Sequence, residues 1–196
     1  MKITDIKPGY ASGNSASIYQ FYVSRNLSPD ERIKIKELSG KIGRRGKLKI
    51  QYTDDHELDW SIEEELMAYY DVEVSEVYNS WISKIAFDYD RELWRKLKPC
   101  EGRGEDDYGI DIEKRNNRIV VSFYYALNYN EAFYEFGEKL FDGLCGLFDN
   151  IRMEIMKGNL SAIYAISDFY GTETEAEWEF VEFSENVQKL QHVLDW

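Results

Sequence analysis

Polar and apolar side chains alternate over several short segments in the first two thirds of the chain. The stretch from Lys47 to Thr53 is the clearest, because Leu48, Ile50 and Tyr52 fall on one side of an extended backbone. Other segments are rich in β-branched and aromatic residues, which favour strands. These segments are Ile18 to Arg25, Val72 to Val77, Trp81 to Tyr89, Ile110 to Lys114 and Arg118 to Tyr125.

Local signals predict turns and short helices between these strands. Asn116-Asn117 separates the last two strands, and asparagine tolerates the positive φ of a tight hairpin. A helix is predicted from Ser28, a suitable N-cap followed by Pro29, to Gly40. By its spacing, Ser61-Ile62-Glu63-Glu64 is a capping box that opens a helix to about Tyr70. A third short helix is predicted from Arg91 to Leu97, before Pro99.

The last third of the chain changes from strand to helix periodicity. Apolar residues recur at helical spacing from Asn130 to Met156, which predicts one long amphipathic helix. Its glycines, Gly137, Gly143 and Gly146, each cost about 1 kcal/mol relative to alanine, so they either permit close packing or mark a break. Gly158-Asn159 ends this helix, and further helices are predicted over Leu160 to Tyr170 and Asn186 to Leu194.

Strands mixed with short helices, followed by helices alone, predict an α+β fold. We expect an antiparallel sheet with short helices, backed by a C-terminal long-helix hairpin. The 196 residues are 43% hydrophobic and 15% aromatic, enough for the core of one domain. We therefore predict a single domain over 1–196, with a C-terminal helical subregion over about 128–196.

Charge is distributed unevenly along the chain, whose net charge is −13 from 37 acidic and 24 basic residues. The segment from Arg32 to Lys49 holds eight basic residues and one acid. The segment from Asp54 to Val77 holds ten acids and no lysine or arginine. An acidic protein repels phosphate backbones on average, so nucleic acid is not expected as a direct partner.

The chain carries no signal for export or for crossing a membrane. No apolar run approaches the roughly 20 residues that a membrane-spanning helix needs. The N-terminus lacks the apolar region of a signal peptide. Cys100 and Cys145 lie far apart in different contexts, which favours a reducing compartment. The predicted location is the cytoplasm, without a membrane partner.

Catalytic and cofactor motifs are missing from the sequence. There is no Gly-x-Ser-x-Gly elbow, and the segment from Gly40 to Lys47 lacks phosphate-loop spacing because Leu48 follows the lysine. His56 and His192 have no second ligand at the spacing of a zinc site. We predict no catalytic residue, resident metal or cofactor. Two carboxylate pairs leave open a metal-dependent hydrolase: Asp111 with Glu113, and Glu131 with Glu135.

The basic segment and two tryptophans supply the candidate interaction residues. Lys47 and Lys49 share one strand face, and Arg44 and Arg45 precede it. These side chains either meet a partner or pair internally with the acids from Asp54 to Glu76. Trp60 follows that basic segment, and Trp178 lies within an acidic, aromatic segment typical of interaction sequences. The predicted interaction residues are therefore Arg44, Arg45, Lys47, Lys49, Trp60 and Trp178.

Several short motifs resemble an uncharacterised bacterial family, in the same order from about Leu27 to Leu194. That family carries Leu-Ser-x-x-x-Arg followed by Leu-Ser, a Tyr-Phe-Asp-Ala…Asn-Trp-Gly core and a Leu-Arg-Gly-Asp-Leu-Arg-Ala-Leu-Tyr hairpin. Asn79-Ser80-Trp81-Ile82 departs from the Asn-Trp-Gly pattern. The resemblance implies a bacterial cytoplasmic protein and no known activity. The matching segments are Leu27 to Arg32 with Leu38-Ser39, Met67 to Val72, Asn79 to Trp81 with Ile85 to Phe87, and Met156 to Tyr164.

These features favour a non-enzymatic protein, an accessory or regulatory subunit that acts through a charge-segregated surface on another protein. The alternative is an acidic inhibitor that mimics nucleic acid and occupies a DNA- or RNA-binding protein. That alternative requires carboxylates spaced like phosphates on one continuous face. The metal-dependent hydrolase is the third hypothesis, and it requires the paired carboxylates to converge. The sequence does not predict the oligomeric state.

Overall fold

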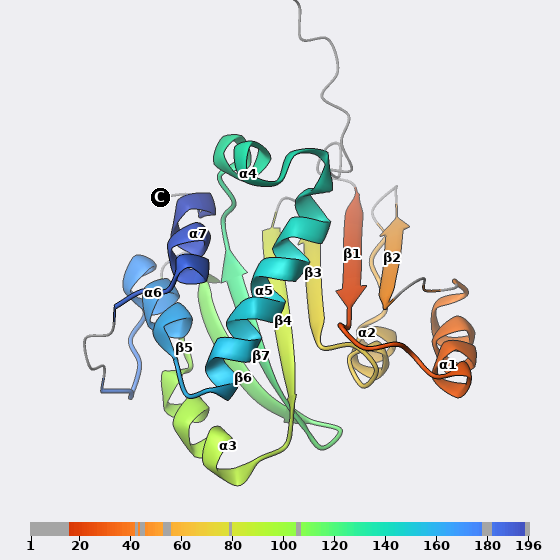
Figure 1. The fold of residues 1–196 in the computed structure, drawn as a ribbon, viewed down its shortest axis with the longest axis horizontal. Helices are drawn as coiled ribbons and strands as arrows, with labels where there is room; N and C mark the ends of the chain where they lie inside the picture. The colour runs from red at the N-terminus through yellow and green to blue at the C-terminus, as the bar shows by residue number, and fades with distance from the viewer. Residues whose placement is uncertain are drawn as a thin grey trace, which may run out of the picture.

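A seven-stranded antiparallel sheet forms the centre of the molecule (Figure 1). The computed structural model describes residues 16–41, 43, 46–52, 56–78, 80–104, 107–177 and 182–194. The strand order is β2-β1-β3-β4-β7-β6-β5, and each neighbouring pair is antiparallel. The strands are β1 Ser17–Tyr22, β2 Lys47–Tyr52, β3 Val72–Val77, β4 Ser80–Asp88, β5 Gly102–Arg103, β6 Gly109–Arg115 and β7 Arg118–Tyr125.

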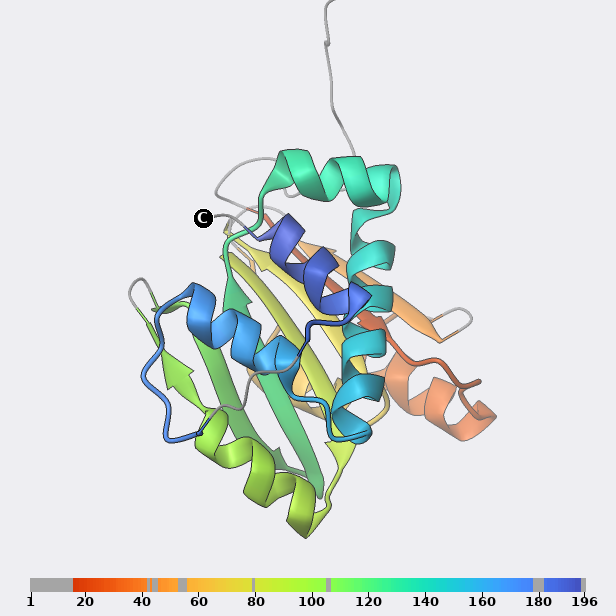
Figure 2. The ribbon, with the colours of Figure 1, turned by 60° about the vertical axis from the view of Figure 1, so that its left-hand side comes forward.

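Most helices lie on one face of this sheet (Figure 2). The longest, α5, crosses the strands diagonally, and α6 and α7 lie beside it toward the β6 side (Figure 1). Side chains such as Val74, Ile85 and Phe123 pack with Phe148 and Ile151 of α5 in one core cluster. The helices of this layer are α3 Arg91–Leu97, α4 Tyr129–Phe136, α5 Leu140–Met156, α6 Ser161–Phe169 and α7 Glu185–Val193, with short 3-10 turns at η1 Lys98–Cys100 and η3 Gly137–Lys139.

A second, smaller core lies on the opposite face of the sheet. Phe21, Leu48 and Ile50 of the first two strands pack there with Ile35 of α1 Pro29–Ser39 and Leu66 of α2 Trp60–Leu66. Among the described helices, only these two belong to that cluster. The same sheet face carries polar and charged side chains farther along, including Lys84, Ser122 and Asp111, which are aligned across β4, β7 and β6.

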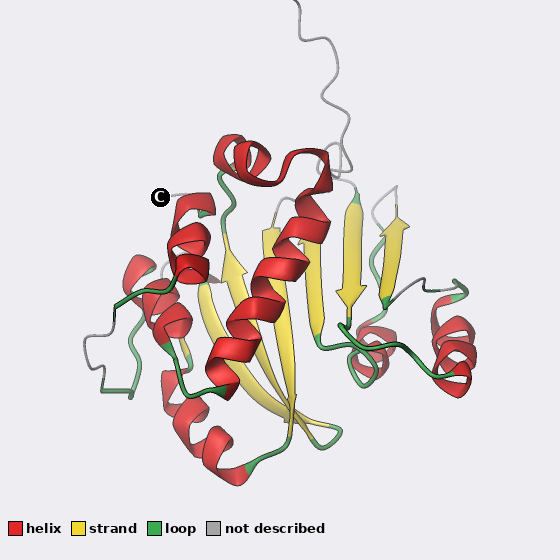
Figure 3. Cartoon of the chain, viewed as in Figure 1, coloured by secondary structure: helices red, strands yellow, loops and turns green. Residues whose placement is uncertain are grey.

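The structure shows the predicted fold class, an α+β arrangement with a C-terminal helical layer (Figure 3). The Asn116-Asn117 hairpin is confirmed, with φ angles of 45° and 60°. The first helix is also confirmed, because Ser28 and Glu31 form a reciprocal capping box and Gly40 ends α1 in the left-handed conformation. No helix within the described ranges is long and apolar enough to cross a membrane.

Two helix predictions were wrong. The long helix predicted over Asn130 to Met156 is divided, because Gly137 takes a φ of 57° and ends α4 before α5 begins. The predicted N-cap at Ser61 is also displaced. Asp59 caps α2 instead, since its carboxylate accepts hydrogen bonds from the backbone N–H and the hydroxyl of Ser61. A carboxylate two residues earlier thus replaced the capping box that the spacing suggested.

Candidate functional site

Four residues of the predicted basic segment are exposed on and just after α1, and Lys49 of β2 is exposed as well. Arg32, Lys34 and Lys36 are exposed on the helix, and Lys41 is exposed after its C-cap. None of the four forms an ion pair with another described residue. Ile33 lies among them with 56% of its surface exposed. We call Ile33 and these four basic residues the α1 basic surface; within it, Arg32 and Lys36 are one helical turn apart.

The basic residues of β2 contact the helical layer. Lys47 Nζ lies 2.9 Å from Asp142 Oδ1, and Lys49 Nζ lies 5.2 Å from the centre of the Phe141 ring. Burial lowers the pKa of Lys49, and the nearby Asp142 opposes this effect. Both lysines therefore join the edge strand to the start of α5. Their acidic neighbour is Asp142, which lies outside the Asp54 to Glu76 run that was the predicted internal partner.

The other predicted interaction residues lie elsewhere or outside the described residues. Arg44, Arg45 and Trp178 fall in segments that the structure does not describe. Trp60 begins α2 and is 60% exposed, with the Arg115 guanidinium 5.2 Å from its ring centre. This contact places Trp60 next to the β6–β7 hairpin rather than beside Lys47 and Lys49. Of the three predicted residues that the structure describes, Trp60 therefore lies apart from Lys47 and Lys49.

Several acids of the Asp54 to Val77 run form ion pairs or hydrogen bonds with other parts of the protein. The Asp71 carboxylate lies 2.6 Å from Arg118 Nη2 and 3.3 Å from Arg152 Nη2. Arg118 also donates hydrogen bonds to the carbonyl oxygens of Met67 and Tyr70, each at 2.7 Å. Glu76 is 1% exposed and accepts a 2.7 Å hydrogen bond from the Tyr129 hydroxyl. These acids therefore fix the neighbouring elements instead of forming a charged surface.

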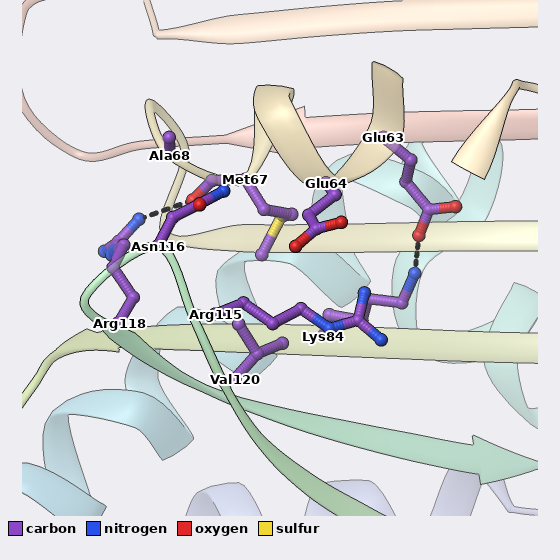
Figure 4. A pocket seen from close by; sticks show the side chains of 9 residues that line it. All are labelled: Glu63, Glu64, Met67, Ala68, Lys84, Arg115, Asn116, Arg118 and Val120. Atoms are coloured by element: carbon purple, nitrogen blue, oxygen red, sulfur yellow. Dashed lines mark hydrogen bonds and ion pairs between the residues drawn. The ribbon is translucent and has the colours of Figure 1, made fainter. Parts of the chain in front are cut away.

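Glu63, Lys84 and Glu73 form a charged group between α2 and the sheet. Lys84 on β4 lies opposite Glu73 on β3, and its ammonium forms an ion pair with Glu63 of α2 (Figure 4). The Lys84 Nζ to Glu73 Oε2 distance is 3.5 Å. Glu73 is fully buried, and its oxygens accept no hydrogen bond from the described residues. Burial raises the pKa of Glu73 to about 8 and lowers the pKa of Lys84 to about 7.

The hollow beside this group is too small for a substrate. It lies between α2 and the β6–β7 hairpin and has a volume of about 20 Å³ (Figure 4). A single water needs roughly 10–15 Å³ measured in this way, so the hollow fits about one water molecule. Glu64, Met67 and Asn116 close it beside Lys84. We therefore interpret Glu63, Lys84 and Glu73 as the attachment of α2 to the sheet rather than as a catalytic group.

The carboxylates considered for metal binding are each paired with a basic side chain. Asp111 accepts hydrogen bonds from Arg103 at 2.9 and 2.5 Å, and Glu113 pairs with Arg115. On α4, Glu131 lies 2.9 Å from His192, and Glu135 lies 3.3 Å from Lys189 of α7. The described residues contain no group of three or more side chains arranged to hold a metal ion.

Both cysteines are buried and free. Burial raises the pKa of Cys100 to about 11 and also raises the pKa of Cys145. A thiol becomes nucleophilic as its thiolate, so these shifts disfavour covalent chemistry at neutral pH. The structure thus provides no activated nucleophile at either position.

A larger hollow, which the sequence did not predict, lies at the opposite end of the molecule from α1. Its volume is about 750 Å³, within the range of small-ligand sites. Residues from η1, from the turn between α5 and α6, and from 175–177 line it. These segments are separated by more than ten residues in the sequence, so no local pattern reveals their meeting. From the sequence, the Met156 to Tyr164 segment predicted only a turn between two helices, not the wall of a hollow.

Comparison with known proteins gave no family model, no curated protein and no solved structure that matches this chain.

Proposed function

We propose that this chain is a non-enzymatic accessory or regulatory protein that binds an acidic segment of another protein through the α1 basic surface. The observation that carries this proposal is the exposure of Arg32, Lys34, Lys36 and Lys41 without an ion-pair partner among the described residues. The protein is acidic overall, with a net charge of −13. Basic side chains left unneutralised on such a protein favour a complementary, acidic partner.

The position of the acids along the sheet strengthens this proposal. The α1 basic surface lies beyond β2 at one edge of the sheet (Figure 1). Glu173, Glu175 and Glu177 are exposed near the other edge, where the 170–175 segment packs against β5, η1 and β6. The sequence from 158 to 188 contains no lysine or arginine. Three exposed acids therefore lie at the end of the molecule away from α1, together with Lys96 and Lys157. Their repulsion would favour the approach of an acidic partner from the side of α1.

The alternative of a nucleic-acid mimic receives less support from the same structure. A mimic needs its carboxylates in a continuous exposed row. Glu73 and Glu76 are buried, and Glu63 and Asp71 pair with basic side chains of the sheet and of α5. Four of the eight described acids of that run are thus used for internal contacts, which interrupts the row of exposed carboxylates that a mimic needs.

The proposal is tested with a fluorescently labelled peptide of about ten glutamates, a model for an acidic partner. Anisotropy would be measured at low and at physiological ionic strength, with wild-type protein and with Arg32→Glu/Lys36→Glu. The control is Arg91→Glu/Arg95→Glu on α3, which removes two exposed basic residues at the same spacing. Both variants change the net charge equally.

We expect the peptide to bind wild-type protein and the α3 control with similar affinity, and the α1 variant about tenfold or more weakly. Added salt should weaken the binding, because the contacts are exposed ion pairs. Equal losses in the two variants would show an effect of net charge alone. That result, or no measurable binding by the wild type, would contradict the proposal. A far-UV circular dichroism spectrum of each variant confirms that α1 and α3 remain folded.

A further inference from the structure

Two neighbouring hollows form one elongated groove at the end of the molecule opposite α1. Their volumes are about 750 and about 250 Å³, and four residues line both of them: Lys96, Lys157, Gly158 and Leu160. One wall consists of α3 and η1, and the other is the turn between α5 and α6 with the residues on either side of it. Figure 2 shows α3 beside the end of α5, where this turn begins. Residues 175–177 complete the larger hollow.

The wall made by α3 and η1 gives the length of the groove. Lys98 keeps a helical backbone, with φ −55° and ψ −37°, so η1 continues directly from α3. The seven residues of α3 rise about 10 Å and the three residues of η1 about 6 Å, which makes a wall of roughly 16 Å. At roughly 3.3 Å each, about five residues of an extended peptide span this length. Peptides this short do not form stable helices in water, so an extended ligand is the better fit.

Apolar side chains line the groove along its whole length. Leu93 and Met156 line the smaller hollow, Pro99 and Tyr164 line the larger one, and Leu160 lines both. Met156 keeps 55% of its surface exposed, and the other four are half-buried. A ligand with apolar side chains would remove this surface from water, which favours its binding.

The backbone at the start of α6 is already hydrogen-bonded within the chain. The Ser161 N–H donates to Asn159 Oδ1 at 2.9 Å. The N–H groups of Ile163 and Tyr164 donate to the Leu160 carbonyl oxygen at 3.0 and 3.1 Å. The polar groups that remain to orient a ligand are therefore the charged side chains of the groove.

These charges follow the order acidic, basic, acidic along the groove. The charged lining residues are Asp90, Glu92, Lys96, Lys157, Glu175 and Glu177. The first two acids line the smaller hollow at the start of α3, whereas the two lysines line both hollows and so lie where the hollows meet. The last two acids line the larger hollow, and the Glu175 N–H donates to the Pro99 carbonyl oxygen at 3.0 Å, which places them beside η1. Four acids and two lysines give the lining a net charge of −2.

None of these six side chains forms an ion pair with another described residue. Their charges are therefore free to meet a ligand. Since both ends of the groove are acidic, an anionic ligand such as a nucleoside triphosphate is a poor match. A ligand that is basic at both ends and acidic in the middle is electrostatically complementary.

We infer that this groove binds a short extended segment of a partner protein, with a basic residue at each end, an acidic residue between them and apolar residues at the alternate positions. The basic residues lie at the two acidic ends of the groove, and the acidic residue lies at Lys96 and Lys157. Alternate side chains of an extended chain lie on opposite faces, so the apolar ones together meet Leu160 and its apolar neighbours. The groove and α1 lie at opposite ends of the molecule, so the inference does not depend on the proposed function (Figure 1).

The test uses the peptide acetyl-Lys-Leu-Glu-Leu-Lys-amide as the probe, with binding measured by isothermal titration calorimetry on the full chain. Its blocked ends imitate a segment inside a longer protein. One comparison peptide, acetyl-Lys-Lys-Leu-Leu-Glu-amide, has the same composition and net charge in a different order. The other, acetyl-Lys-Ser-Glu-Ser-Lys-amide, keeps the order of charges and lacks the apolar side chains.

The protein variant is Glu92→Gln/Glu175→Gln, which removes one charge from each acidic end of the groove. The control is Glu37→Gln/Glu138→Gln, which removes two exposed acids outside the groove and changes the net charge equally. A far-UV circular dichroism spectrum of each variant confirms that the helices remain folded.

We expect the probe to bind wild-type protein and the control with similar affinity, and the groove variant about tenfold more weakly, because charged contacts at both ends are lost. Both comparison peptides should bind wild-type protein about tenfold or more weakly than the probe, since one misplaces the charges and the other buries no apolar surface. The inference is overturned if the probe does not bind, if either comparison peptide binds equally well, or if the groove variant binds like the control.

Discussion

Glu73 and Lys84 lie opposite each other on neighbouring strands, in a part of the sheet that α2 shields from water. Removing a charge from water is costly, and each side chain responds by favouring its neutral form. Burial therefore raises the pKa of Glu73 to about 8 and lowers the pKa of Lys84 to about 7. Such shifts link the stability of the fold to pH.

The first prediction concerns this pH dependence. In the unfolded chain Glu73 loses its proton near its ordinary pKa of 4.5, whereas the folded protein keeps it up to about 8. The folded state thus binds the extra proton in between, so the Glu73 contribution to stability falls as pH rises through this window. The contribution of Lys84 to stability rises with pH, but only above a pH of about 7, where the folded protein loses the Lys84 proton before the unfolded chain does. The window between about pH 5 and pH 7 therefore isolates Glu73.

Glu73→Gln should remove this slope. Relative to wild type, the variant should gain roughly 5 °C in Tm between about pH 5 and about pH 7, where 1 kcal/mol corresponds to a few degrees. Thermal unfolding followed by circular dichroism measures the effect. A Tm difference that stays constant over this window would show that Glu73 ionises normally in the folded protein.

The second prediction concerns the pairing of Lys84. At a pH of about 6, where Lys84 is charged, Lys84→Met leaves the Glu63 carboxylate without its cation, and breaking a buried pair in this way typically costs about 3–5 kcal/mol. The double variant Lys84→Met/Glu63→Leu should be more stable than Lys84→Met alone, because the unpaired carboxylate is removed as well. Urea unfolding of the wild type, Lys84→Met, Glu63→Leu and the double variant measures the interaction free energy of the two side chains. Additive losses would contradict the pairing.

At the scale of elements, local patterns predicted those parts of the fold that depend on neighbours in sequence. Three features follow from adjacent residues alone: the strand over Lys47 to Thr53, the Asn116-Asn117 hairpin and the helix start at Ser28. The sequence left open whether its glycines permit close packing or break the helix, and the apolar spacing, which continues through Gly137, did not decide between the two. What ends the helix is a positive φ, and periodicity does not report it.

The third prediction separates two glycines of this region. Gly137 has a φ of 57°, so Gly137→Ala should cost about 1 kcal/mol through backbone strain. Gly146 lies inside α5, and an added Cβ there meets no atom within 4 Å. Gly146→Ala should therefore stabilise the protein by about 1 kcal/mol through helix propensity. Urea unfolding measures both variants; equal effects of the same sign would show that Gly137 is not the breaking point.

At the scale of the whole molecule, charge segregation links the sequence to the proposed function. The sequence revealed the basic and acidic runs, but it did not reveal which charges are used internally. Lys47 forms an ion pair with Asp142, and Asp71 forms ion pairs with Arg118 and Arg152; all of these partners come from distant segments. Among the described residues of the basic segment, Arg32, Lys34, Lys36 and Lys41 are exposed without an ion pair, whereas Lys49 is exposed but lies over the Phe141 ring. The groove beside α6 was missed for the same reason, since distant segments form it.

The central claim is that the α1 basic surface recognises an acidic partner. The most direct measurement is quantitative capture from an extract of the native host, using three immobilised proteins. They are the wild type, Arg32→Glu/Lys36→Glu on α1 and the charge-matched Arg91→Glu/Arg95→Glu on α3. Mass spectrometry identifies what each retains before and after a salt wash.

We predict an acidic protein that the wild type and the α3 variant retain, that the α1 variant loses, and that salt releases. Recovery of the same proteins by all three forms, or of no protein by the wild type, would contradict the claim.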